Sequence, residues 1–447
     1  MQAVLDKNFI PAAVWCEDFL KIAKKPFHIA LERENGFIYR YDTFVSDEAE
    51  RNNFYIERIV KTLLWLVGGY KVTLSGDEEV FKYIKNCYKE DGLRRFDWRY
   101  MAHCYEKPFA VEYVQPEDMP KEKNSSYSIG RHLDGNRIGF DAGGSDMKVT
   151  AVKDGEVIFS TEVVWLPKEN DDPSYHYANI KSAVQQGLDA LGGKADALGV
   201  SSAGVFVDNR TRAASLFIKI PNNMTDPQIT DIYLNIAKDF ALPVVVANDG
   251  DVAALAGSIS LGKNRVLGIA MGTSEAGGYV DKNGNITGWL NELAFVPCDF
   301  NKDAMKDEWS EDFGVGCKYF SQDAVIKLAA VADITFAEGL TPAQKLKHVQ
   351  KLLDEGDNGA TQIFETIGVY FGYAIVYYSF FYDIDYIQLL GRTSSGKGGD
   401  IIVEKAREVL NTEYSELAEK ITIFIPSEHE RRVGQSIAAA SLPEIIS

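Results

Sequence analysis

The residues of this sequence that are best suited to chemistry lie at the end of one short apolar strand and directly after it. They are Asp141, Gly143, Gly144, Ser145 and Lys148. Glycine lets backbone N–H groups approach a ligand closely, and successive N–H groups form a concavity that binds anions. A carboxylate at the strand end is suited to hold Mg²⁺, directly or through water, and a lysine beyond the turn can neutralise phosphate charge. The set therefore predicts a site for a metal-bound polyphosphate.

Each of these residues also has an ordinary structural explanation. Gly143 and Gly144 can form a plain tight turn, Asp141 can start that turn, and Lys148 can be a solvated strand residue. The combination at these spacings, rather than any single residue, favours phosphate binding.

A second candidate, Asn248-Asp249, stands between an apolar strand and an alanine-rich helix. One interpretation is structural: Asp249 or Asp251 caps the helix. The other is catalytic: Asp249 is a general base that takes the proton from a hydroxyl attacking a γ-phosphate, while Asn248 holds a neighbouring hydroxyl. Phosphoryl transfer needs mainly positioning and charge neutralisation, so one base, one metal and two phosphate-binding turns would suffice.

The strand–turn–strand pattern around Gly143 recurs 129 residues later. Gly272 then falls on Gly143 and Ser274 on Ser145, with Thr273 completing the second turn. Repetition of a whole unit favours duplication over coincidence. Two such turns that face each other across a cleft would grip a triphosphate from both sides.

A third glycine-bearing turn begins at Gly391-Arg392, after a short strand at 387–390. Such a turn can seat a nucleotide base and ribose, and a plain strand-to-helix loop is an equally good alternative. The aromatic, apolar stretch before it, at 369–382, is too short to span a bilayer and is expected to form a buried helix.

These motifs need an α/β scaffold, and the periodicity along the chain predicts one. The expected N-terminal elements are strands across 27–44, with a turn at Asn35-Gly36, and at 70–75, and helices at 48–67 and 77–88. A polar segment at 121–134 is predicted to be a linker. The later strands are expected at 137–142, 148–152, 157–165, 198–202, 243–247, 266–271, 277–280 and from 286 onward, with helices at 174–191 and 226–240.

Composition narrows the function classes. The chain has 447 residues and a formal net charge of −18. Such a surface repels DNA, RNA and anionic membranes, so no nucleic-acid or membrane partner is expected. The five cysteines lack zinc-type or disulfide-type spacing, which indicates a reducing compartment. The first residues show no basic start followed by an apolar core, so no signal peptide is predicted and a cytoplasmic location is expected.

Several segments together resemble the motifs of the ROK family of sugar kinases. They are residues 138–148, 248–249, 268–278, 288–293, 383–391 and 434–440. The resemblance implies two actin-like ATPase lobes around a central cleft, ATP and Mg²⁺ as cofactors, and a homodimer. Asp249 matches the family's catalytic base and Glu292 a sugar-binding glutamate, and Asn248 and Gly204 are expected to bind the substrate beside them.

The resemblance also predicts which residues bind each part of the nucleotide. Asp141 is expected to serve Mg²⁺. The phosphates are expected at Gly143, Gly144, Ser145, Lys148, Gly272, Thr273 and Ser274, and the rest of the nucleotide at Gly391 and Arg392.

The sequence departs from the family pattern at several positions. Phe295 stands where a histidine is usual, three residues after Glu292. Of the zinc motif Cys-x-Cys-Gly-x-x-Gly-Cys only Gly316-Cys317 remains, with Ser310 and Asp312 in place of the other cysteines. A tetrahedral site that lacks three of four ligands cannot bind Zn²⁺ tightly, so no structural zinc is predicted.

Two further departures concern the nucleotide. A Glu275 carboxylate close to phosphates would repel them unless it points away or helps to hold the metal. Arg392 replaces a glycine of the adenosine motif and could stack on adenine or block it.

The predicted organisation is α/β, with duplicated actin-like (ribonuclease H-like) lobes. A small α/β extension spans 1–134, a first lobe spans 135–260 with helix 430–445 packing back on it, and a second lobe spans 261–429. The extension opens with strands and lacks a basic recognition helix, so a winged-helix DNA-binding domain is not expected.

Two functions fit these motifs. One is an ATP- and Mg²⁺-dependent kinase that acts on a hydroxyl of a sugar or sugar derivative. The other is a non-catalytic sugar or nucleotide sensor that retains the kinase fold. The intact base and first phosphate turn favour the enzyme.

Overall fold

The computed structural model describes residues 1–123, 128–426 and 428–445, with side chains of the last helix from Gly434 onward. The chain forms two compact units, each assembled from segments far apart in the sequence. Unit 1 comprises Met1–Asn124, Ile269–Gly277 and Asn291–Ile425, and unit 2 comprises Ser125–Gly268, Gly278–Leu290 and Pro426–Ser447. Part of the predicted linker, residues 124–127, lies outside the described residues.

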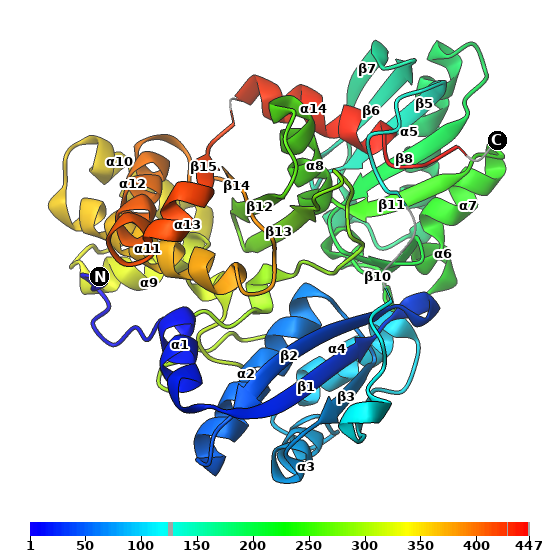
Figure 1. Cartoon of the computed structure of the whole chain (residues 1–447). Coiled ribbons are helices and arrows are strands. Elements are labelled where there is room, and N and C mark those ends of the chain that lie inside the picture. Colours follow the sequence, from blue (N-terminus) through cyan, green and yellow to red (C-terminus); the bar gives the residue numbers. More distant parts are fainter. Residues whose placement is uncertain (124–127, 427, 446–447) are drawn as a thin grey trace. The chain divides into compact units, whose positions relative to one another are not determined.

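Unit 2 is built on a five-stranded mixed sheet in the order β11-β8-β5-β6-β7. Its strands are β5 (Asn136–Ala142), β6 (Asp146–Lys153), β7 (Glu156–Val164), β8 (Ala197–Ser202) and β11 (Val244–Asn248). The predicted antiparallel meander of β5, β6 and β7 is confirmed, and β8 and β11 run parallel to β5. The carboxyl ends of three parallel strands therefore meet at one edge of this sheet (Figure 1).

Helices cover both faces of this sheet. They are α5 (Pro173–Ala190), α6 (Pro227–Thr230), α7 (Ile232–Asp239), α8 (Asp249–Leu261) and α14 (Glu428–Ala440). On one face, α5 and α7 bury residues such as Val184 and Ile236 against Ile138 and Val200 of the strands. The helix predicted at 226–240 is interrupted, because Asp231 leaves the helical region between α6 and α7.

The opposite face of the sheet is covered by α8 and α14, which lie side by side (Figure 1). The helix α14 approaches the strands closely because β5 and β8 carry glycine there. A Cβ at Gly139 would lie 2.1 Å from the carbonyl oxygen of Ser436, and one at Gly199 would lie 1.7 Å from that of Ala439. A short hairpin of β9 (Val205–Val207) and β10 (Arg210–Ala213), which was not predicted, follows β8.

The N-terminal part of unit 1 contains a four-stranded sheet in the order β2-β1-β3-β4, and a helix precedes its first strand, so the expectation that the extension opens with strands is wrong. Its elements are α1 (Ala12–Ile22), β1 (Lys25–Glu32), β2 (Ile38–Val45), α2 (Ala49–Leu66), β3 (Lys71–Ser75), α3 (Glu78–Cys87), α4 (Arg95–Tyr105) and β4 (Ala110–Tyr113). The strands and helices predicted between residues 27 and 88 are confirmed. The sequence analysis does not predict α1 or α4, since neither helix starts with a capping side chain.

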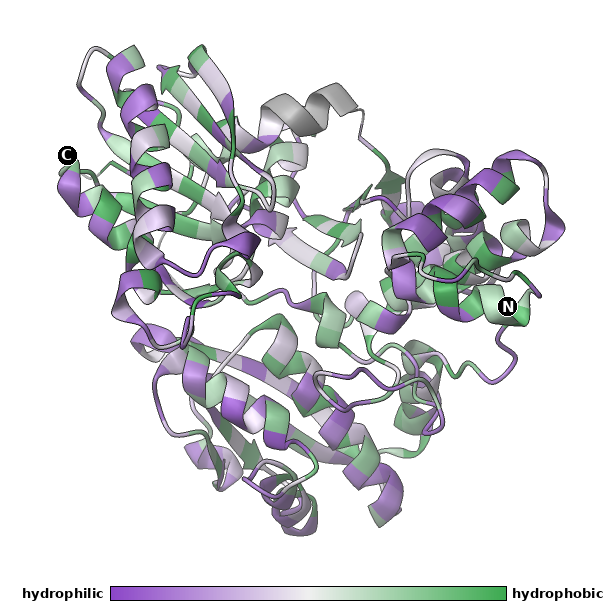
Figure 2. Ribbon diagram, turned by 180° about the vertical axis from the view of Figure 1, so that it is seen from behind, coloured by the Kyte–Doolittle hydropathy of each residue, from purple (hydrophilic) through white to green (hydrophobic). Residues whose placement is uncertain are grey.

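The rest of unit 1 is mostly helical. Its helices are α9 (Gln322–Val331), α10 (Pro342–Asp354), α11 (Asn358–Tyr378), α12 (Gly396–Glu413) and α13 (Ser415–Lys420). The aromatic stretch near residue 370 forms the buried second half of α11, as predicted. Figure 2 shows hydrophilic and hydrophobic residues alternating along most helices, as amphipathic packing requires. Within the described part of the chain, no helix is both long and apolar enough to cross a bilayer.

The second copy of the meander is only partly regular. Its strands β12 (Val266–Met271) and β13 (Glu275–Val280) join β14 (Tyr386–Leu390) and β15 (Thr422–Phe424) in the order β13-β12-β14-β15. The third strand predicted from residue 286 is wrong, because only an isolated bridge joins Val280 and Ile286. Positive φ angles at Gly288 and Asn291, +70° and +51°, interrupt the extended backbone there.

Candidate functional site

The edge of the unit 2 sheet gathers the polar residues that end its parallel strands. Asp141 on β5 is level with Ser201 on β8, and Asn248 ends β11 beside Ser202. The Asp141 carboxylate accepts a 2.6 Å hydrogen bond from the Ser201 hydroxyl, and the Gln435 amide of α14 donates to it at 3.4 Å. This edge therefore presents a buried, hydrogen-bonded carboxylate.

Two carboxyl groups at this edge lie where charge is disfavoured. Burial raises the pKa of Asp141 to about 6; the Ser201 hydrogen bond opposes the rise, and the negative charge of Asp249 adds to it. Burial also raises the pKa of Asp249, which is half-buried in the first turn of α8, while the Gly250 N–H opposes that rise. A nearby cation would favour the charged form of both groups, and a carboxylate with a raised pKa is a better general base.

The predicted first phosphate turn connects β5 and β6. The Gly143 N–H donates to the Asp146 carbonyl at 2.9 Å, and the indole N–H of buried Trp165 donates to the Gly143 carbonyl at 2.8 Å. A Cβ at position 143 would lie 2.7 Å from the Asp146 carbonyl oxygen, so this turn requires glycine. Gly144 and Ser145 are exposed at its tip. The backbone is thus anchored from within while the tip stays open to a ligand.

Lys148 lies directly across the strand pair from Asp141. Opposite residues in an antiparallel pair share one face of the sheet, and the lysine's positive charge lowers the pKa of Asp141. The structure therefore brings together, in unit 2 alone, the carboxylate, the glycine turn and the lysine that the sequence singled out.

Asn248 caps α8. Its side-chain oxygen accepts a 2.7 Å hydrogen bond from the Gly250 N–H, and its amide donates to the Gly204 carbonyl at 2.7 Å. The structural alternative for Asp249 and Asp251 is therefore wrong, since Asn248 is the cap and Asp251 accepts from the Tyr279 N–H at 3.1 Å.

Gly204 belongs to the same group of contacts. Its φ is +140°, and a Cβ there would lie 2.3 Å from the Ala213 carbonyl oxygen. A cavity of about 50 Å³ lies beside Gly204 and Asn248, and its other lining residues include Phe206, Ile286 and Trp289. Because ligand pockets usually enclose about 300–1,000 Å³, this cavity can accept only part of a sugar-sized molecule.

Unit 1 carries the second predicted phosphate turn, Gly272-Thr273-Ser274. The Gly272 N–H donates to the Ser274 carbonyl at 2.9 Å, and Thr273 and Ser274 are exposed. Its Gly272 carbonyl accepts a 2.9 Å hydrogen bond from the Gln322 N–H at the start of α9. Like the first turn, it is three residues long, and the carbonyl of its first residue accepts a hydrogen bond from the rest of its unit.

The turn that begins at Gly391 packs against the end of β12. Gly391 has a φ of +99°, and a Cβ there would lie 2.2 Å from the Met271 carbonyl oxygen. The same oxygen accepts a 2.9 Å hydrogen bond from the Thr393 N–H. The side chain of Arg392 is exposed, and its carbonyl accepts from the Gln350 amide at 2.8 Å. Two of the three predicted ligand-binding turns therefore adjoin within unit 1.

Glu275 points away from the second turn. Its side chain is buried, accepts a 3.2 Å hydrogen bond from the Tyr378 hydroxyl and fills the space beside Gly316, where a Cβ would lie 2.0 Å from the carboxyl oxygen. Burial raises the pKa of Glu275 to about 8. Burial therefore favours the neutral form of this carboxyl, and of the two possibilities for this residue the structure shows the first.

Glu292 lies in unit 1, against the end of α2. The N–H groups of Asn291 and Glu292 donate to the carbonyls of Leu66 and Trp65, at 2.9 and 3.0 Å. The Asn291 side chain accepts a 2.7 Å hydrogen bond from the Tyr382 hydroxyl, which holds the left-handed backbone at this position. Glu292 itself is half-buried. The N-terminal extension thus contacts the segment that the sequence assigns to the substrate.

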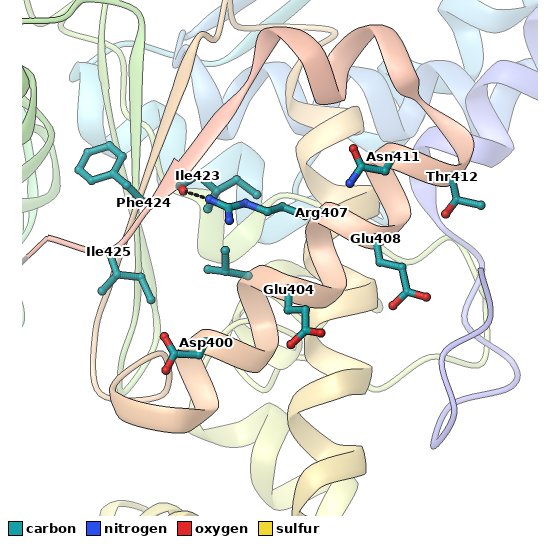
Figure 3. Close-up of a pocket in the computed structure, with 10 residues that line it drawn as sticks. Asp400, Glu404, Arg407, Glu408, Asn411, Thr412, Ile423, Phe424 and Ile425 are labelled. Carbon is teal, nitrogen blue, oxygen red and sulfur yellow. Dashed lines mark hydrogen bonds between the residues drawn. The ribbon is translucent and has the colours of Figure 1, made fainter.

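A larger cavity, of about 840 Å³, lies between α12 and β15 in unit 1 (Figure 3). Asp400, Glu404 and Glu408 line it from α12, and the Arg407 guanidinium donates to the Ile423 carbonyl at 2.7 Å. Its lining includes none of the residues predicted to bind substrate or nucleotide, and its carboxylates would repel phosphates.

Several residues at the site are not identified by the sequence analysis. They are Ser201, Trp165, Gln435 and Trp65. The Ser201-Ser202 pair after an apolar strand is a signal of the same kind as Asn248-Asp249. The other three act through contacts with distant residues, which local patterns do not indicate.

Comparison with known proteins identifies the family. A family model described as "ROK family" matches residues 137–440, which is more than half of the chain. The chain belongs to the ROK family. The match begins at β5 and ends with α14, so the ROK region contains every predicted site residue and excludes the whole N-terminal extension.

Solved ROK structures share the fold. A ROK hexokinase from Thermus thermophilus is 17% identical, with a TM-score of 0.54, over 69% of this chain and 97% of that one. A ROK transcriptional regulator, a homologue of the E. coli MLC protein, is 14% identical, with a TM-score of 0.51, over 69% and 79%. A ROK protein from Streptococcus pneumoniae, solved with sucrose, is 14% identical, with a TM-score of 0.50, over 68% and 97%. A search of curated proteins found no match.

The ROK fold thus confirms the actin-like ATPase architecture predicted for the chain. Since the family includes kinases and transcriptional regulators, membership alone does not decide between an enzyme and a binding protein.

The residues at the degenerate zinc motif do not fit a zinc ion. The carboxylate of Asp312 is bound by the Arg58 guanidinium at 3.0 and 3.1 Å, and Ser310 donates its hydroxyl hydrogen bond to Asp307 at 2.8 Å. Phe295, which stands where the family pattern has a histidine, packs against an aromatic ring. Cys317 is the one cysteine of the motif that remains. Among the described residues, no group of three or more His, Cys, Asp or Glu side chains is placed to hold a metal ion.

Proposed function

We propose that this ROK protein is an ATP-dependent phosphotransferase that acts on a hydroxyl of a sugar or sugar derivative. The observation that carries the proposal is the sheet edge of unit 2. There Asp141 and the turn at 143–145 stand at the end of β5, and Asp249 follows β11, which flanks β8 on its other side. Phosphoryl transfer requires this combination of metal ligand, phosphate-binding backbone and base.

In this proposal Asp249 accepts the proton of the attacking hydroxyl, and its raised pKa makes it a stronger base. Asn248 and Gly204 shape the substrate side of the base, since Asn248 holds the Gly204 carbonyl at 2.7 Å. Glu292 binds a substrate hydroxyl, and its segment is fixed by two backbone hydrogen bonds to α2.

The donor side of the reaction would be served by both turns. Exposed backbone N–H groups and hydroxyls at Gly144, Ser145, Thr273 and Ser274 are suited to phosphate oxygens. Asp141 fits a magnesium ion, because a buried carboxylate with a raised pKa is stabilised by a cation. Bound Mg²⁺ would neutralise phosphate charge during transfer. The cytoplasmic location expected from the sequence and the homodimer that the resemblance implies both stay predictions.

A non-catalytic sensor is the second candidate. Two observations favour it: both polar groups of Asn248 are engaged within the chain, and the cavity beside Asn248 measures only about 50 Å³. Such a protein would bind sugar or nucleotide without turnover.

A coupled ADP-release assay separates the two functions. The purified chain with ATP and Mg²⁺ is tested against hexoses, amino sugars and N-acetylated sugars. The proposal expects ADP release that saturates with at least one sugar and depends on Mg²⁺. Saturable ATP or sugar binding by calorimetry, without sugar-dependent ADP release, would contradict the kinase and support the sensor.

A further inference from the structure

Six charged side chains form a closed ionic cluster in the interior of unit 1. They are Glu57, Arg58 and Lys61 of α2, Arg94 and Asp97 around the start of α4, and Asp312 of the loop at 305–317. None is more than 3% exposed. Three acidic side chains meet three basic ones, so the formal charges of this charge cluster balance.

Asp312 is the member that lies outside the N-terminal extension. Its carboxylate accepts two hydrogen bonds from Arg58, at 3.0 and 3.1 Å, and lies 2.8 Å from Arg94 and 3.5 Å from Lys61. A two-point arginine–carboxylate pair fixes orientation as well as distance. Burying so many charges is costly, and removing one partner leaves another uncompensated. The cluster is therefore better suited to fixing the position of the loop than to adding stability.

Trp65 connects the charge cluster to Glu292. Its indole N–H donates to the Asp97 carboxylate at 2.7 Å, and its ring centroid lies 4.3 Å from that of Phe295. Its backbone carbonyl accepts the Glu292 N–H at 3.0 Å. The last carbonyls of a helix have no partner within the helix, so α2 uses them to hold the Glu292 segment.

The same loop is the one in which the family pattern places zinc ligands. Asp312 and Ser310 stand at two of those positions, and Phe295 at a third. Here Asp312 belongs to the charge cluster, and Phe295 packs against Trp65. Both positions are therefore engaged in contacts with α2 and α4 where the family pattern has metal ligands.

We propose that the charge cluster and Trp65 are positioning residues for Glu292, and that they replace a metal ion in fixing the segment at 291–317. The N-terminal extension is then a structural part of the substrate site. The inference rests on the proposed function in one respect, the substrate role of Glu292. The mechanical link from Asp97 through Trp65 to Glu292 does not depend on it.

The variant Trp65→Phe tests the link, because it keeps an aromatic ring but removes the N–H that binds Asp97. The first measurement is amide hydrogen exchange. We expect the peptides covering 288–296 to exchange about tenfold faster than in the wild type, with other peptides of unit 1 little changed. The matched control is Trp15→Phe on α1 of the same unit, whose ring stacks on Phe19 and meets Phe300 edge-on, so it contacts the segment at 291–317 away from Glu292 and Phe295.

The second measurement is steady-state kinetics with the best sugar. A residue that positions Glu292 should affect the KM for sugar selectively. We expect Trp65→Phe to raise the KM for sugar about tenfold while the KM for ATP and kcat change less than about twofold. A purely structural role would lower the active fraction, and so kcat, without moving the KM for sugar.

The third measurement is elemental analysis of the wild-type chain. We expect less than about 0.1 zinc per chain, and hydrogen exchange across 291–317 that a chelator does not change. One zinc per chain, released by the chelator together with faster exchange in this segment, would overturn the replacement of the metal.

Wild-type exchange at 288–296 in Trp65→Phe, or equal acceleration throughout unit 1, would overturn the positioning role. If Trp65→Phe does not fold, Asp97→Asn tests the charge cluster by the same exchange measurement, because it removes the charge that Lys61 meets while keeping an acceptor for Trp65. If no sugar supports turnover in the wild type, the proposed function fails, and hydrogen exchange still decides the positioning role.

Discussion

The two three-residue glycine turns share length and anchoring, but the acidic residue after each is placed differently. Asp146 follows the first turn and stays half-exposed at the sheet edge. Glu275, the equivalent residue 129 positions later, turns into the interior and meets Tyr378. The repeated feature is therefore the backbone of the turn, and burial decides what the adjoining carboxyl can do.

This difference extends to the surroundings of the turns. The first turn lies beside Asp141, Lys148 and Asp249, which are groups suited to metal and proton chemistry. The second is lined by exposed hydroxyls, and burial favours the neutral form of the acid that follows it, Glu275. If both turns bind phosphate, the first adds groups for metal and proton chemistry, and the second adds only neutral backbone and hydroxyl donors.

The largest expected effect is the loss of the base beside the first turn. Asp249→Asn should lower kcat about 10²- to 10⁴-fold, because the amide cannot accept the hydroxyl proton, while ATP binding stays within about twofold. Coupled ADP release and calorimetry measure the two quantities. Asp239→Asn, an exposed carboxylate of the same unit, is the control. Near-normal turnover by Asp249→Asn would refute the base assignment.

The second effect concerns the buried acid of the second turn. The pKa of Glu275 is raised to about 8 from 4.5, so its contribution to stability is present below pH 4.5 and is lost as the pH rises through 8. Glu275→Gln removes this loss. The difference in free energy of unfolding between the variant and the wild type should therefore shift in favour of the variant by about 3 kcal/mol from pH 5 to pH 8, as measured by urea denaturation. Glu416→Gln, on the exposed side of α13, should show no such gain.

A similar but smaller effect is expected at the first turn. The pKa of Asp141 is raised to about 6 from 3.8, so its stabilising contribution is lost as the pH rises through 6. Without Mg²⁺ at pH 8, the free energy of unfolding of Asp141→Asn should exceed that of the wild type by up to about 3 kcal/mol. In the presence of Mg²⁺ and ATP the same variant should lose activity. A variant that is both less stable and fully active would contradict the metal role.

The smallest effect distinguishes the turns themselves. A Cβ at Gly143 would lie 2.7 Å from a carbonyl oxygen, whereas one at Gly272 would lie 3.7 Å from its nearest neighbour. Gly143→Ala should therefore destabilise the chain by about 1–3 kcal/mol, and Gly272→Ala by less than about 0.5 kcal/mol. Urea denaturation of the two variants is a direct comparison, and equal losses would show that the turns are sterically alike.

Local patterns predicted the parts of the fold that depend on neighbours in sequence. The apolar strand β5, the glycine turn after it and the polar cap before α8 all follow from residues within a few positions of one another. The same reasoning expected a third strand after residue 286, and the positive φ angles at Gly288 and Asn291 prevent it.

The role of the N-terminal extension could not be predicted in this way. On sequence alone, Glu57, Arg58 and Lys61 have the character of solvated helix residues, yet they are buried. Their partner Asp312 lies 254 positions from Arg58, and no local periodicity relates the two. Contacts of this length appear only when the chain has folded.

The glycines at positions 139 and 199 have a consequence for the order of folding during synthesis. They expose a strip of sheet backbone that α14 covers, and α14 begins about 290 residues after β5. At about 5–20 residues per second, a ribosome needs roughly 15 to 60 seconds to deliver that cover. The nascent chain must hold an unfinished apolar surface throughout this interval, so we expect the synthesis of α14, rather than formation of the sheet, to limit the folding of unit 2.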